Sequence, residues 1–88
     1  MKLIISVIRD IDHDPVSRAL TSGGYRVTVI ASTGGFLRRG SITLLIGLED
    51  HQVDDALTLI RKNCSPANEP GQKRATIFVL PVDNLVQL

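Results

Sequence analysis

The sequence has few aromatic residues, a single cysteine and no excess of charge of either sign. Its aromatic side chains are Tyr25, Phe36 and Phe78, fewer than an RNA-stacking surface normally uses. Cys64 stands alone, which excludes a disulfide or a cysteine-based zinc site within one chain and indicates a reducing compartment, the cytoplasm. The net charge of +1 gives the whole chain no electrostatic preference for nucleic acid or membranes.

Long apolar runs are also missing. The apolar start of the chain, residues 1–8, is too short to span a bilayer and lacks the small-residue cleavage site of a signal peptide. Hydrophobic residues make up 43% and charged residues 22% of the chain, as in ordinary globular proteins. The length of 88 residues predicts one domain, residues 1–88, with no membrane span.

The hydrophobic pattern predicts four strands and two helices in the order β-α-β-β-α-β. The strands are expected at about residues 2–9, 25–31, 41–48 and 75–81, and the helices at about 15–22 and 50–62. Asp14 is the expected N-cap of the first helix and Pro15 its first residue. This order is typical of an α+β, ferredoxin-like fold, in which both helices cover the same face of the sheet.

The first and fourth strands have apolar residues on both faces. These residues are Leu3, Ile4, Ile5, Val7 and Ile8 in the first strand and Ile77, Phe78, Val79 and Leu80 in the fourth. A sheet with one wet face would alternate apolar and polar residues instead. Because each buried Ile or Leu is worth roughly 1.5–3 kcal/mol, we predict that another copy of the chain covers the face that the helices leave bare.

The loop between the second and third strands, residues 32–40, has the composition of an anion-binding site. Its three glycines let the backbone approach a ligand and turn N–H groups toward it. Arg38 and Arg39 offer donors to phosphate, and Phe36 could stack on a nucleobase. The residue types also fit a flexible, soluble strand connection, since the loop matches neither a Walker-type loop nor a Gly-x-Gly-x-x-Gly turn.

The acidic run Asp10, Asp12 and Asp14 does not form a calcium-binding loop. Pro15 and Thr21 stand where an EF-hand needs Gly and Glu. We therefore attribute these carboxylates to helix capping and solvation.

The remaining polar residues give no metal-binding or catalytic pattern. His13 and His51 lie in separate turns and do not form a metal-binding pair. Cys64 has no neighbouring histidine, so we expect a structural or incidental thiol. Lys73 and Arg74, just before the fourth strand, are candidate phosphate contacts, although edge charge that discourages aggregation would explain them equally well. No set of nucleophile, base and orienting group supports an enzyme.

Around the glycine-bearing loop the chain has strings of residues that are more specific. They are ASTGGFLR at 31–38, Gly40 and LIGLED at 45–50, within a stretch that runs from residue 1 through residue 54, and ATIFVLPVD at 75–83. In these strings the sequence closely resembles the cyclic di-AMP receptor family of PII-like signal transduction proteins. The string TGGFLR is specific to that family, whereas FVLPV is shared with PII proteins generally. The resemblance implies a homotrimer of ferredoxin-like subunits with three ligand sites in the clefts between them.

The resemblance also implies the ligand contacts. Residues that match the family's dinucleotide contacts are Arg26, Thr28, Gly35, Phe36, Leu37, Gly47 and Gln87, with Ser41 where the family usually has Asn. Arg38 joins Lys73 and Arg74 as a candidate phosphate contact. Ser41 offers one hydroxyl in place of a two-ended amide. The connection from about Cys64 to Arg74 is shorter than the family's, which leaves the ligand more exposed.

The sequence therefore predicts a non-enzymatic sensor of cyclic di-AMP or a related adenine nucleotide, with no other cofactor and no metal. Ligand binding would change a surface that a protein partner reads. Two alternatives remain open at this point. One is a short-loop relative that has lost cyclic di-AMP binding and acts as an oligomeric interaction module. The other is a small enzyme, such as a phosphatase-like hydrolase, supported only by the arginines of the loop.

Overall fold

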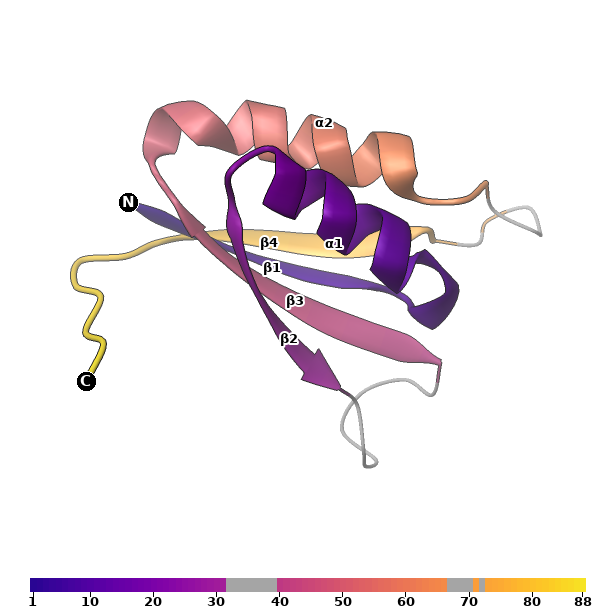
Figure 1. Cartoon of the computed structure of the whole chain (residues 1–88), viewed down its shortest axis with the longest axis horizontal. Helices are drawn as coiled ribbons and strands as arrows, with labels where there is room; N and C mark the ends of the chain where they lie inside the picture. The colour runs from indigo at the N-terminus through magenta and orange to yellow at the C-terminus, as the bar shows by residue number, and fades with distance from the viewer. Residues whose placement is uncertain (32–39, 67–70, 72) are drawn as a thin grey trace.

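The structure is a computed structural model that describes residues 1–31, 40–66, 71 and 73–88. Its helices and strands follow the predicted order (Figure 1). They are β1 (Lys2–Arg9), η1 (Asp10–Asp12), α1 (His13–Ser22), β2 (Arg26–Ala31), β3 (Ser41–Leu48), η2 (Asp50–Gln52), α2 (Val53–Asn63) and β4 (Ala75–Pro81), where η1 and η2 are short 3₁₀ turns. Among the described residues, no helix is long and apolar enough to cross a membrane.

The four strands form one antiparallel sheet in the order β2-β3-β1-β4. β1 is central and pairs along its length with β3 and β4, so that Ile4 lies opposite both Ile46 and Val79. Figure 1 shows α1 and α2 on the same face of this sheet. The predicted ferredoxin-like α+β fold is therefore confirmed.

The core lies between this face and the two helices. Alternation along the strands turns every second residue toward the helices, and each helix contributes an apolar stripe. The most deeply buried apolar side chains are Ile4, Ile8, Leu44 and Ile46 from the sheet, Val16 and Leu20 from α1, and Ala56 and Ile60 from α2. At the start of β2, Tyr25 is also buried, and its hydroxyl donates to the Asp55 carboxylate at 2.6 Å.

The first helix begins earlier than the sequence suggested. It starts at His13, with Asp12 at the N-cap position, so Asp14 lies inside the first turn and does not cap the helix. Pro15 is tolerated there because N–H groups in the first turn have no partner within the helix. The Asp12 carboxylate caps no backbone N–H of α1; it is committed to other partners, described below.

The face of the sheet away from the helices is apolar and uncovered within the described chain. By strand register it carries Leu3, Ile5, Val7, Ile30, Leu45, Phe78 and Leu80. Phe78 remains 52% exposed, and Ile30 and Leu80 each remain 43% exposed. The expectation of a second apolar face is thus confirmed. We call this surface the open face.

The burial pattern predicts that the same substitution, Ile to Ala, lowers the free energy of unfolding much more at one position than at another. Ile46→Ala empties a side-chain position that is 0% exposed, and we expect it to lower the free energy of unfolding by about 2–5 kcal/mol. Ile11→Ala, at a side chain that is 63% exposed, should cost about 0.5 kcal/mol. Urea denaturation measures both, and equal losses would contradict the assigned core.

Candidate functional site

Three of the predicted ligand contacts meet at the β2 edge of the open face. Arg26 lies directly opposite Gly47 in the strand register, and Thr28 lies opposite Leu45, the residue two before Gly47. Arg26 and Thr28 share a face because they are two residues apart in one strand, and both are exposed. Among the residues that the structure describes, and apart from its chain neighbours, a Cβ at Gly47 would meet no atom within 4 Å. The result is a guanidinium and a hydroxyl beside bare backbone, which we call the Arg26 patch.

The Arg26 patch has the chemistry of an anion site next to an apolar surface. A guanidinium donates in pairs to phosphate oxygens. Among the described residues Arg26 makes no ion pair. The neighbouring Leu3 and Leu45 side chains on the open face offer apolar contact to a flat ring. The patch can therefore hold a group that is anionic at one end and aromatic at the other.

The other predicted contacts lie elsewhere in the chain. Ser41 begins β3 and Gly47 lies near its end, which separates them by roughly 20 Å along an extended strand. Gln87 is exposed in the segment after β4. That segment leaves the sheet at the end where Gly47 lies, because the Val82 amide donates to the Met1 carbonyl at 3.0 Å. Gly35, Phe36, Leu37 and Arg38 lie outside the described residues.

Arg74 lies on the helix side of the sheet, away from the Arg26 patch. With Arg61 it borders an apolar groove of about 340 Å³ between α2 and β4; the other lining residues are Leu57, Ile60, Cys64, Ala75, Ile77 and Val79. Lys73 beside it is exposed. Within one chain, the structure therefore does not bring Arg74 and Arg26 together at one phosphate.

Cys64 is buried in the wall of this groove. Burial is the main cause that raises the pKa of its thiol, and the negative charge of Asp12 adds to the increase. The cysteine is therefore protonated at neutral pH, which agrees with the unreactive thiol, structural or incidental, expected from the sequence.

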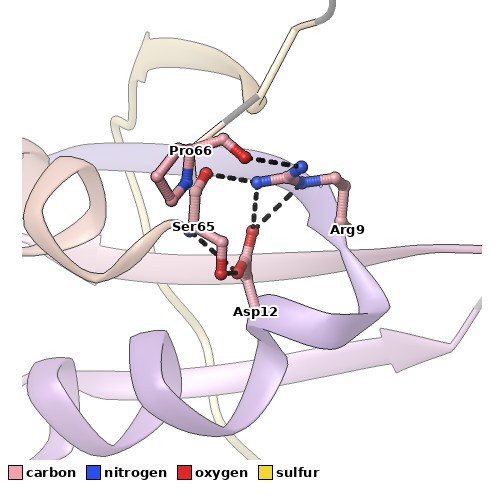
Figure 2. A network of polar contacts seen from close by, with 4 residues as sticks. All are labelled: Arg9, Asp12, Ser65 and Pro66. Carbon is pink, nitrogen blue, oxygen red and sulfur yellow. Dashed lines mark hydrogen bonds and ion pairs between the residues drawn. The ribbon is translucent and has the colours of Figure 1, made fainter. Parts of the chain in front are cut away.

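A polar network around one buried carboxylate joins the β1–α1 junction to the segment after α2 (Figure 2). The Asp12 carboxylate is fully buried. One of its oxygens accepts bonds from the Ser65 amide at 2.9 Å and the Ser65 hydroxyl at 2.7 Å, and the other pairs with the Arg9 guanidinium at 3.1 Å. Arg9 also donates to the carbonyl oxygens of Ser65 and Pro66. Asp12 thus holds two segments of the chain together, and attributing it to capping and solvation was wrong.

These partners keep Asp12 ionised despite its burial. Burial alone would raise the pKa of the carboxyl, but the hydrogen bonds from Ser65, together with the charge and hydrogen bond of Arg9, outweigh it and hold the pKa below its ordinary value of 3.8. No local signal in the sequence reveals this role, because Ser65 lies 53 positions from Asp12.

The comparisons with known proteins agree with the fold and with the specific strings in the sequence. Residues 1–70 match the sequence profile of the cyclic-di-AMP receptor family. The match includes the Arg26 patch and Ser41 but not β4 or Gln87. A solved structure of a protein of unknown function from Pediococcus pentosaceus is similar to this chain, with a TM-score of 0.78 and 32% sequence identity. That similarity covers 99% of this chain and 96% of the other.

The lowered pKa of Asp12 predicts a stabilising contribution that depends on pH. Because the carboxyl has a lower pKa in the folded protein than in the unfolded chain, its ionisation stabilises the fold above about pH 4, and this contribution is lost as the pH falls through the lowered folded pKa. We expect Asp12→Asn to reduce the free energy of unfolding at neutral pH by about 1–3 kcal/mol. The deficit should shrink in acid.

Urea titrations between about pH 2 and pH 7 measure this deficit. Asp14→Asn, an exposed carboxylate of the same acidic run, is the matched control and should cost less than about 1 kcal/mol at neutral pH. A deficit for Asp12→Asn that stays constant down to the lowest pH would contradict the ionised, partnered state of Asp12.

Proposed function

The chain belongs to the cyclic-di-AMP receptor family, and we propose that it binds cyclic di-AMP or a related adenine nucleotide without transforming it. The observation that carries this proposal is the Arg26 patch, where a guanidinium, a hydroxyl and open backbone stand beside an apolar surface. Phosphate on Arg26 and adenine on the apolar residues would use both halves of the patch. Membership of a receptor family likewise supports a binding protein over an enzyme.

The proposed ligand site lies between copies of the chain in a homotrimer. The open face carries exposed Phe78, Leu80 and Ile30, and covering them would remove a large apolar surface from water. The Arg26 patch belongs to that same face, so a neighbouring copy packed there would form one wall of the pocket. Since Ser41 is far from Gly47 along β3, a neighbouring copy would also supply contacts that a single chain does not bring to the patch.

The proposed output is a change in a surface that a protein partner recognises, in the cytoplasm. A ligand at a seam between subunits binds one arrangement of the surrounding segments better than others, and so shifts their populations. The single cysteine and its protonated thiol are compatible with a reducing compartment.

Isothermal titration calorimetry with purified protein tests the ligand. We expect cyclic di-AMP to bind, and Arg26→Ala to weaken binding about 10- to 100-fold, because a hydrogen-bonded charge pair is lost. Arg18→Ala removes an exposed arginine of α1 and should leave the affinity unchanged. Ser41→Asn should tighten binding, since an amide can both donate and accept.

The titration also separates this function from its alternative. A protein that gives no heat with cyclic di-AMP, ATP, ADP or AMP does not act as an adenine-nucleotide sensor. If the Ser41→Asn variant also gives no heat with these nucleotides, a short-loop relative that acts as an interaction module explains the protein better.

Sedimentation velocity tests the assembly. Phe78→Glu changes a side chain that is 52% exposed in a single chain, so its charge harms folding little but would be desolvated at a subunit interface. We expect the wild type to sediment as a trimer and Phe78→Glu as a lighter species. Ile11→Glu, at an exposed position outside the sheet, should remain trimeric. A folded wild-type monomer would contradict the proposed seam.

A further inference from the structure

The two long connections of the chain are both attached to the short η1 turn. The β2–β3 connection ends at Gly40, whose carbonyl accepts the Asp10 amide at 2.8 Å. The α2–β4 connection begins beyond α2 at Cys64, and the next residue, Ser65, binds the Asp12 carboxylate through its amide and its hydroxyl. Asp10 and Asp12 are the first and last residues of one three-residue turn. The two connections therefore share one anchor.

Arg9 strengthens this shared anchor from the strand side. Its guanidinium pairs with Asp12 and donates to the carbonyls of Ser65 and Pro66, as Figure 2 shows. Its backbone lies opposite Ser41 in the β1–β3 register. A single residue thus adjoins a predicted ligand contact with its backbone and holds the other connection with its side chain.

The anchor is built on a carboxylate that is shielded from water while Ser65 is docked. The side chain of Asp12 is 0% exposed and that of Arg9 is 15% exposed. If Ser65 left, one carboxylate oxygen would lose both of its hydrogen bonds at once, and the turn would have to rearrange or admit water to satisfy that oxygen.

We propose that Arg9 and Asp12 are positioning residues that couple the Gly40–Ser41 end of one connection to Ser65–Pro66 at the start of the other. This inference rests on the proposed function in one respect, which is that Ser41 belongs to the nucleotide site. A nucleotide that holds Ser41 in place stabilises η1 in the geometry that docks Ser65. By linkage, a protein partner that holds Ser65–Pro66 in the docked position raises the affinity for the nucleotide by the same factor.

The docked segment is therefore the proposed site at which a partner reads nucleotide occupancy. Ser65 and Pro66 are exposed at the surface, and they lie at the end of the sheet where β3 begins, because Arg9 contacts both and pairs with Ser41. The proposal rests on hydrogen bonds that join one three-residue turn to both connections.

Amide hydrogen exchange of the ligand-free protein tests the coupling directly. Ser65→Ala removes one hydroxyl donor to Asp12, and we expect the amides of residue 65 and of Asp10 to exchange faster by a similar factor, about three- to ten-fold. Thr58→Ala removes a hydroxyl bond to the Asp54 carbonyl on α2 and should leave both rates unchanged. Ser65→Thr keeps a hydroxyl and should restore the wild-type rates.

A faster residue-65 amide with an unchanged Asp10 amide would overturn the coupling, because the two connections would then move independently. The same holds if Thr58→Ala accelerates Asp10 as much as Ser65→Ala does, since the effect would then be general destabilisation.

A second measurement adds cyclic di-AMP. In the wild type, saturating cyclic di-AMP should slow amide exchange at Ser65. Ser65→Ala should weaken cyclic di-AMP binding by about five-fold, which is at the low end of the coupling factors usual between two sites of one protein. Binding by the wild type with no change at Ser65 would overturn the link to the nucleotide. If the wild type binds no adenine nucleotide, the proposed function fails and the nucleotide link fails with it, whereas the ligand-free exchange still decides whether the two connections are coupled.

Discussion

Two helices can cover only one face of a sheet, so a sheet that is apolar on both faces leaves apolar side chains exposed on the other. This constraint decides where the chain can associate and where it can bind. The helices cover the face that carries Ile4, Leu44 and Ile46, each 0% exposed. Their neighbours along each strand, such as Ile5 and Leu45, necessarily point to the open face. The chain has no third layer among its described residues to place there. The open face is therefore a direct result of strands whose alternate positions are also apolar.

The Arg26 patch lies on the open face at its β2 edge. If a neighbouring copy covered the apolar centre of the open face, the Arg26 patch would lie at the rim of that subunit interface. Polar groups at such a rim remain reachable by a small ligand after the centre of the face is covered. The fold thus separates a surface suited to association from a border suited to binding an anion, and it places both on the same side of the sheet.

Much of the fold was predictable from local patterns, because period and turn chemistry act over a few residues. Short apolar runs predicted β1 and β4, and apolar spacing predicted both helices. The start of α1 was misplaced because Asp14 and Pro15 fit an N-terminus equally well two residues later than the true one. The role of Asp12 was missed for a different reason. Its partner Ser65 is distant in sequence, and the sequence alone does not distinguish a buried aspartate from a solvated one.

The site was predictable only in part. Arg26, Thr28 and Gly47 do converge, since β2 and β3 pair in register. Within one chain, Ser41 does not reach the Arg26 patch because it lies at the opposite end of β3. Arg74 does not reach the patch because it lies on the helix side of the sheet. Family resemblance gives residue identities without saying which copy of a chain supplies each one. The packing of the sheet provides the reason to look between copies.

The empty space above Gly47 has an evolutionary consequence. Since an added methyl group would approach no atom of the described residues beyond its chain neighbours within 4 Å, and the residue does not have the positive φ that only glycine adopts easily, folding of the described part of the chain places little constraint on this position. A constraint against larger side chains there would come from what packs on the surface, which is a ligand or a neighbouring copy of the chain. Substitutions at residue 47 in descendants of this protein would therefore record changes in binding or assembly more than changes in the stability of one subunit.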